Sequence, residues 1–143
     1  MLAIALAWAT TSFFPVACRR GEPDGTGTQG AQRVISQTTV SDEILWNLGP
    51  EARGRVLAVS SLADDPNYSD IANRWEREVP RMRGTSESLL ASNPDLVVIA
   101  TFTAPETQAV LRAQNIRLRV LDGFRGFADY RSHTRNIAAD LGI

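Results

Sequence analysis

The 143-residue sequence contains one cysteine, one histidine and no lysine. Because Cys18 is the only cysteine, an intrachain disulfide is excluded. Because His133 is the only histidine, a zinc site built from several imidazoles is excluded as well. All 15 basic residues are arginine, so an arginine by itself is weak evidence for a site. They balance 16 acidic residues, which argues against the basic surface that nucleic-acid binding requires.

Two arrangements typical of enzymes are also missing. The sequence has no Gly-x-Ser-x-Gly turn for a nucleophilic serine, and His133 has no evident pair of catalytic partners. The segment 36–39 follows the first expected strand but contains no glycine, so it does not match a phosphate-binding loop. We therefore expect a protein that is not an enzyme and that needs no cofactor.

The N-terminal segment has the character of an export signal. Residues 1–17 are almost wholly apolar, are too few to span a membrane comfortably, and are followed by Arg19 and Arg20. We interpret 1–17 as a signal peptide; an uncleaved membrane anchor or a buried N-terminal helix is the alternative. Residues 18–32 contain glycines and no large apolar side chain, which predicts a flexible tether.

The junction Pro15-Val16-Ala17-Cys18 resembles the lipobox of bacterial lipoproteins. The resemblance implies that Cys18 receives lipid and becomes the first residue of the mature protein. Pro15 stands where leucine is usual, and no basic residue precedes the apolar segment. We expect an exported lipoprotein held at the membrane, in the periplasm or at the cell surface.

From residue 33 onward, short apolar runs alternate with longer amphipathic stretches, a pattern typical of βα units on a parallel sheet. The fold class is therefore predicted as α/β, a three-layer, flavodoxin-like lobe over 33–143. The expected strands are 33–36, 56–60, 95–100 and 117–122. The run 96–99 has no polar member and predicts a central strand, whereas the alternation over 117–120 predicts a strand near an edge.

Helices are expected over 41–48, 86–91 and 128–141, and a fourth starts near Thr103. Thr103 and Glu106 have the spacing of a capping box, and Gly49 suits the end of the first helix. One stripe of the last helix packs inward, which leaves His133 on the opposite, exposed side. The stripe consists of Tyr130, Thr134, Ile137, Ala138 and Leu141.

Over this region the sequence resembles the N-terminal lobe of the periplasmic substrate-binding proteins of ABC importers for iron siderophores, haem and cobalamin. The combination and order of short segments carry the resemblance, since no single segment is specific. They are 33–36, Asp42-Glu43-Ile44-Leu45, Leu48-Gly49, 56–60, 85–90, Asn93-Pro94-Asp95-Leu96-Val97-Val98, and 115–116 leading into 120–122.

The resemblance implies a transport function with an inner-membrane permease as partner. Ligands of such proteins lie between two lobes, and 143 residues leave no room for the second, so the chain corresponds to half of a clamp. The resemblance also places Glu87 where the family docks on permease arginines. A carboxylate in the first turn of a helix is the simpler interpretation of Glu87.

Ligands of open parallel sheets collect beyond the carboxyl ends of the strands. Aromatic groups there offer flat apolar area to a macrocycle or chelate, and hydroxyl or guanidinium groups can bind its charged periphery. Each candidate has a loop or packing role as its alternative, and a core role is favoured for Trp46 and Trp75. The predicted ligand-binding residues are Tyr68, Phe102, Thr38, Ser61, Arg125 and Trp75.

Asp64 and Asp65 beside Asn67 suggest a hard cation, but their spacing fits no calcium loop, and a solvated turn before Pro66 is favoured. No metal site is predicted. Two other functions remain open: a lipoprotein adaptor that binds a protein partner, and a small flavodoxin-like enzyme or sensor domain.

Overall fold

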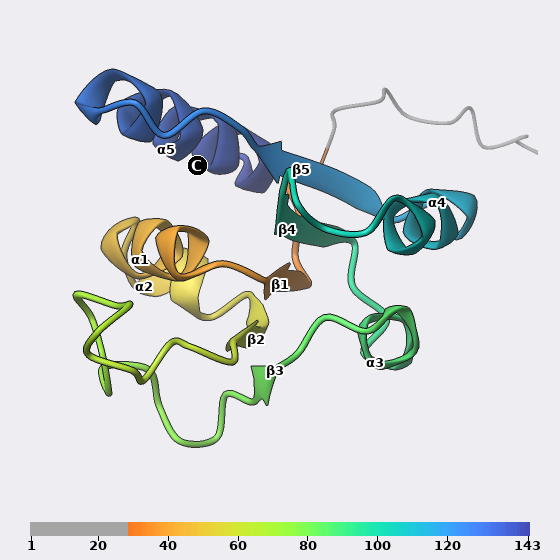
Figure 1. Cartoon of the computed structure of the whole chain (residues 1–143), viewed down its shortest axis with the longest axis horizontal. Helices are drawn as coiled ribbons and strands as arrows, with labels where there is room; N and C mark the ends of the chain where they lie inside the picture. The colour runs from red at the N-terminus through yellow and green to blue at the C-terminus, as the bar shows by residue number, and fades with distance from the viewer. Residues whose placement is uncertain (1–28) are drawn as a thin grey trace, which may run out of the picture.

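The computed structural model describes residues 29–143 (Figure 1). The predicted signal peptide, Cys18 and most of the predicted tether lie outside the described residues. Ala31 is buried, and its amide donates to the carbonyl oxygen of Asp140 at 2.8 Å. A Cβ at Gly30 would lie 1.8 Å from the Leu141 carbonyl oxygen. Close packing thus includes residues just before 33, which the sequence assigned to the tether.

A five-stranded parallel sheet forms the centre of the fold, in the order β3-β2-β1-β4-β5. Four strands confirm those expected, and their bounds agree to within one residue. The short strand β3 was not predicted, because it has only two residues. The strands are β1 Val34–Ser36, β2 Val56–Ser60, β3 Arg81–Met82, β4 Leu96–Ala100 and β5 Arg117–Leu121.

Helices cover both faces of the sheet, which confirms the three-layer α/β architecture (Figure 1). Helices α1 (Thr39–Asn47), α2 (Pro50–Arg53) and α5 (Phe127–Leu141) pack on one face, around Ile44, Leu45 and Ile137. Helices α3 (Ser86–Ala91) and α4 (Pro105–Ala113) cover the other face through Leu89 and Leu111. None of the helices within 29–143 is long and apolar enough to cross a membrane.

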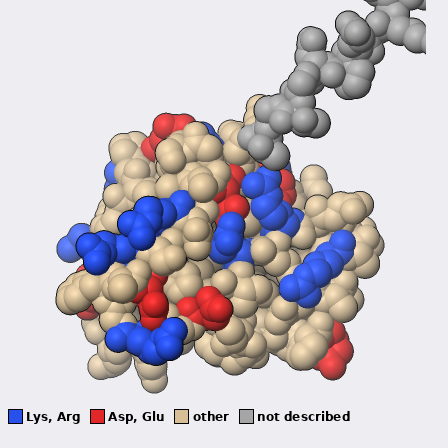
Figure 2. Space-filling model, turned by 90° about the horizontal axis from the view of Figure 1, so that it is seen from above, with Lys and Arg blue, Asp and Glu red and all other residues tan. Residues whose placement is uncertain are grey.

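Strand β5 lies at the edge of the sheet, as the alternation of polar and apolar residues over 117–120 predicted. Arg119 does not face open solvent, however, because Nε donates to Oδ2 of Asp140 on α5 at 2.6 Å. This ion pair raises the pKa of Arg119. On the face seen in Figure 2, blue arginine groups are interspersed with red carboxylates.

Two local predictions are wrong. Thr103 does not cap α4: the N-cap is Ala104, without a side-chain hydrogen bond, and the Thr103 carbonyl oxygen accepts from Gln108 Nε2 at 2.8 Å instead. His133 is not on the surface but only 5% exposed, and its Nε2 lies 2.7 Å from the carbonyl oxygen of Asp122. The first turns of α5 pack over the loop that follows β5, which widens the buried face beyond one stripe.

Candidate ligand-binding site

The parallel strands end along one edge of the sheet, and a cavity of about 320 Å³ opens there. A second hollow of about 240 Å³ adjoins it and shares Gln37, Gly84 and Phe102 with it. Phe102 is 86% exposed and stands where the two meet. The first cavity is lined by Gln37, Thr38, Thr39, Ser60, Ser61, Leu62, Met82, Arg83, Gly84 and Phe102.

Hydroxyl groups hold the turn between β1 and α1 that forms one wall of the cavity. Thr38 is the N-cap of α1, and its Oγ1 accepts from the amide of Ser41 at 3.0 Å. Ser36 Oγ and Ser41 Oγ lie 2.6 Å apart in the buried interior. This capping box satisfies amides at the start of the helix, so the turn is rigid without any glycine.

A buried carboxylate holds the end of β2, the neighbouring strand, where Ser60 lines the cavity. Asp42 on α1 is 0% exposed; its Oδ2 accepts from Ser60 Oγ at 2.5 Å, and its Oδ1 accepts from the Ser60 amide at 3.2 Å. Burial raises the pKa of Asp42, and the hydrogen bonds from serine oppose that rise. Ser61 and Leu62 follow directly, so this contact fixes where the cavity-lining loop begins.

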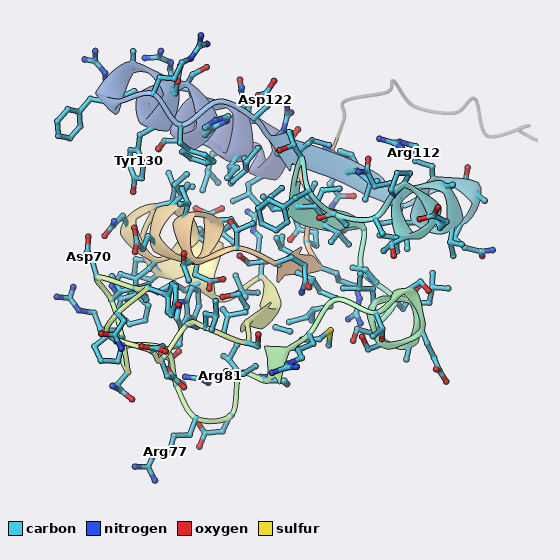
Figure 3. The ribbon with its side chains drawn as sticks, viewed as in Figure 1. Asp70, Arg77, Arg81, Arg112, Asp122 and Tyr130 are labelled. Carbon is cyan, nitrogen blue, oxygen red and sulfur yellow. The ribbon has the colours of Figure 1, made fainter. Side chains whose placement is uncertain are left out.

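Arg81, the first residue of β3, holds the C-terminal end of the loop 61–80 (Figure 3). Its Nε donates to Oδ2 of Asp64 at 2.7 Å, and its Nη2 donates to the carbonyl oxygen of Trp75 at 3.0 Å. The guanidinium lowers the pKa of Asp64. Asp64 therefore serves as an ion-pair partner rather than a cation ligand. Across residues 29–143, no group of three potential metal ligands is present.

No family model matches the chain, and no curated protein matches it. Solved structures do. The haem-binding protein HutB of Vibrio cholerae matches with a TM-score of 0.63 and 19% identity, over 78% of this chain and 41% of that one. A periplasmic haem-binding protein from Pseudomonas aeruginosa matches with a TM-score of 0.61 and 18% identity, over 78% of this chain and 39% of that one.

RhuT, a periplasmic haem-binding protein from Roseiflexus sp. RS-1, matches with a TM-score of 0.51 and 28% identity, over 64% of this chain and 34% of that one. This chain has the fold of one lobe of such periplasmic binding proteins. It spans about 40% of the length of HutB and of the Pseudomonas protein. The predicted kinship to one lobe of this class is thereby confirmed at the level of fold.

Three of the predicted ligand-binding residues meet in the lobe's strand-end cavity: Thr38, Ser61 and Phe102. Tyr68 is 62% exposed on the loop after β2, outside the lining of both hollows. Arg125 is exposed on the loop after β5, where its Nε lies 3.6 Å from Oδ2 of Asp129.

Trp75, the sixth predicted ligand-binding residue, lies in the interior of the fold. It is 3% exposed, and its ring meets Trp46 edge-on at 5.3 Å between centroids. The burial of Trp75 and its contact with Trp46 support the packing interpretation for both tryptophans, and ligand contact by Trp75 stays a prediction. The loop from 61 to 80 folds back on α1, so an aromatic side chain within it became part of the core.

Arg83, Met82 and Gln37 line the cavity, and the sequence analysis did not select them. Met82 ends the two-residue strand β3 and Arg83 follows it directly, so neither was recognised as a strand-end residue while that strand went unpredicted. Gly84 explains how Gln37 reaches the cavity: a Cβ at that position would lie 2.0 Å from Gln37 Oε1.

Proposed function

We propose that residues 33–143 act as the first lobe of the substrate-binding component of an ABC importer, and that haem is the favoured ligand. The observation that carries this proposal is an exposed phenylalanine at the strand-end cavity of a lobe whose structural neighbours bind haem. Other iron chelates and cobalamin belong to the same proposal as alternative ligands.

The chemistry of the cavity suits a porphyrin. Phe102 presents a flat apolar face, which a macrocycle can cover by stacking. Arg83 and the hydroxyl groups of Thr38 and Ser61 offer donors to the carboxylates at the macrocycle's rim. Tyr68 lies outside the cavity lining but on the same loop as Ser61, and its phenol oxygen is of the kind that ligates haem iron in some proteins.

Replacing Phe102 by alanine is expected to weaken haem binding about fivefold to tenfold, because stacked aromatic contacts contribute roughly 1 kcal/mol beyond area burial. The change is measured as the shift in dissociation constant from a Soret absorbance titration. Phe127→Ala is the matched control, since Phe127 is 87% exposed but lies outside the cavity. Equal loss in both variants would refute the assignment of haem to the strand-end cavity.

Glu87 is the proposed contact with the permease. It is exposed in the first turn of α3, so it can contact a basic surface of the permease without any change in the fold. Export and lipid attachment at Cys18 belong to the same proposal, because a permease in the inner membrane requires its binding protein on the outer side.

Glu87→Gln is expected to slow association with the permease and to make that association less sensitive to salt, because an exposed rim charge acts mainly on encounter. The melting temperature should change little. Surface plasmon resonance at two salt concentrations measures the rates, and Glu106→Gln, in the first turn of α4, is the matched control. A drop in melting temperature with unchanged association would support the helix-dipole interpretation instead.

A further inference from the structure

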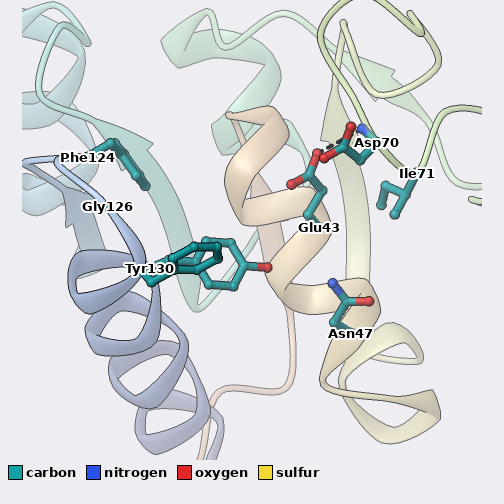
Figure 4. A pocket seen from close by; sticks show the side chains of 8 residues that line it. Glu43, Asn47, Asp70, Ile71, Phe124, Gly126 and Tyr130 are labelled. Atoms are coloured by element: carbon teal, nitrogen blue, oxygen red, sulfur yellow. Dashed lines mark hydrogen bonds between the residues drawn. The ribbon is translucent and has the colours of Figure 1, made fainter.

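A separate hollow lies on the helical face, between α1 and α5, with a volume of about 500 Å³ (Figure 4). It shares no lining residue with the strand-end cavity. Its size falls within the range of small-molecule sites, roughly 300–1,000 Å³. We call it the α1–α5 groove; its lining residues are Glu43, Asn47, Asp70, Ile71, Phe124, Gly126, Phe127 and Tyr130.

Aromatic side chains form the α5 side of the groove. Phe124 is half exposed, Phe127 is 87% exposed, and Tyr130 is partly buried against the core. The Phe124 ring packs on His133 with 4.9 Å between ring centroids, and this contact supports the phenylalanine ring. In Figure 4, Phe124 and Tyr130 stand on the α5 side and face α1 across the groove.

The opposite side carries negative charge. Oε1 of Glu43 accepts from the backbone amide of Asp70 at 3.0 Å, which ties α1 to the 61–80 loop and fixes the carboxylate in place. Asp70 itself adds a second carboxylate, and none of the lining residues is basic. Because no third potential metal ligand joins them within the described residues, the pair does not match a metal site.

We propose that the α1–α5 groove binds a small organic cation, of the quaternary ammonium type. Aromatic faces attract such cations through their quadrupoles, and two carboxylates add a field of the complementary sign. A quaternary ammonium sheds water more readily than a metal ion, so it suits a partly apolar hollow. The proposal is independent of the haem assignment, because the two hollows are separate.

The test uses choline and its neutral isostere 3,3-dimethylbutan-1-ol as probes of the full chain, with binding followed by amide NMR shifts. Choline is expected to saturate shifts around Asn47 and Gly126, and the neutral alcohol to bind at least threefold more weakly. Phe127→Ala should weaken choline binding about threefold to fivefold, as expected for an exposed cation–π contact. Glu43→Gln keeps an acceptor for the Asp70 amide and should weaken choline but not the alcohol.

Phe102→Ala is the matched control, because Phe102 is as exposed as Phe127 but lines the other cavity. It should leave choline binding unchanged. Equal affinity for choline and the alcohol would overturn the proposal and show an apolar groove without preference for charge. Absence of saturable shifts in the groove at millimolar choline would overturn it as well. Neither result would bear on the response of haem binding to Phe102→Ala.

Discussion

Asp42→Leu is expected to lower the free energy of unfolding by about 2–4 kcal/mol, because it leaves two buried donors of Ser60 without an acceptor. The Ser60 hydroxyl and amide both donate to the Asp42 carboxylate, and both residues are buried. Leucine fills the space and keeps water out, so the donors cannot recover a partner. The same change should loosen the start of the loop that lines the strand-end cavity.

Asp42→Asn should behave differently, since an amide still accepts from the Ser60 amide and can donate to its hydroxyl. Burial raises the pKa of Asp42 above its ordinary value of 3.8. The folded chain therefore holds this proton to a higher pH than the unfolded chain, and the group's contribution to stability falls as pH rises through that interval. An uncharged asparagine does not incur this loss.

Urea unfolding at pH 7 and in the acid range measures both effects. At pH 7 we expect Asp42→Asn to be at least as stable as the parent chain, with its advantage shrinking below the raised pKa of Asp42. Asp42→Leu should be the least stable at both values. If Asp42→Asn loses as much stability at pH 7 as Asp42→Leu, the ionised carboxylate stabilises the fold and this account of Asp42 is wrong.

Periodicity predicted the sheet well because its central strands are continuous apolar runs. The segment Leu96-Val97-Val98-Ile99 has no polar member, and it is buried throughout in β4. The predictions that went wrong depend on tertiary contacts. Whether Thr103 caps a helix depends on the chain direction before Pro105, and whether His133 is buried depends on how α5 lies over the preceding loop.

The candidate site was predictable in part for the same reason. Parallel strands bring their carboxyl ends together, so Thr38, Ser61 and Phe102 could be expected to meet. For Trp75 the sequence favoured a core role but left ligand contact open, because its loop has no periodicity that reveals a packed side. Arg83 was missed because it follows β3, a two-residue strand too short to be revealed by a pattern in the sequence.

Haem is expected to bind the 143-residue chain weakly, about a thousandfold more weakly than a two-lobed protein would bind it. A ligand held between two lobes loses most of its contact with water, whereas roughly half of the surface of a ligand on one lobe stays accessible to solvent. If the faces contribute comparably, the loss is several kcal/mol, and each 1.4 kcal/mol is about tenfold in dissociation constant. A nanomolar complex would become micromolar.

A second lobe should restore affinity only when a rigid connection fixes its position, because free association of the two faces has its own entropic cost. The 143-residue chain is also expected to show no closure on binding, since residues 29–143 supply no face opposite the strand-end cavity. Small-angle scattering with and without haem checks this point, and an unchanged radius of gyration is the expected result.

Calorimetric titration of haem into the purified 143-residue chain tests the central claim most directly, namely that the strand-end cavity is one face of a two-lobed haem site. The expected result is one-to-one binding with a dissociation constant of about 1–100 μM, the micromolar range that loss of one face predicts. Nanomolar binding would show that one lobe suffices, and no binding at all would contradict the haem assignment.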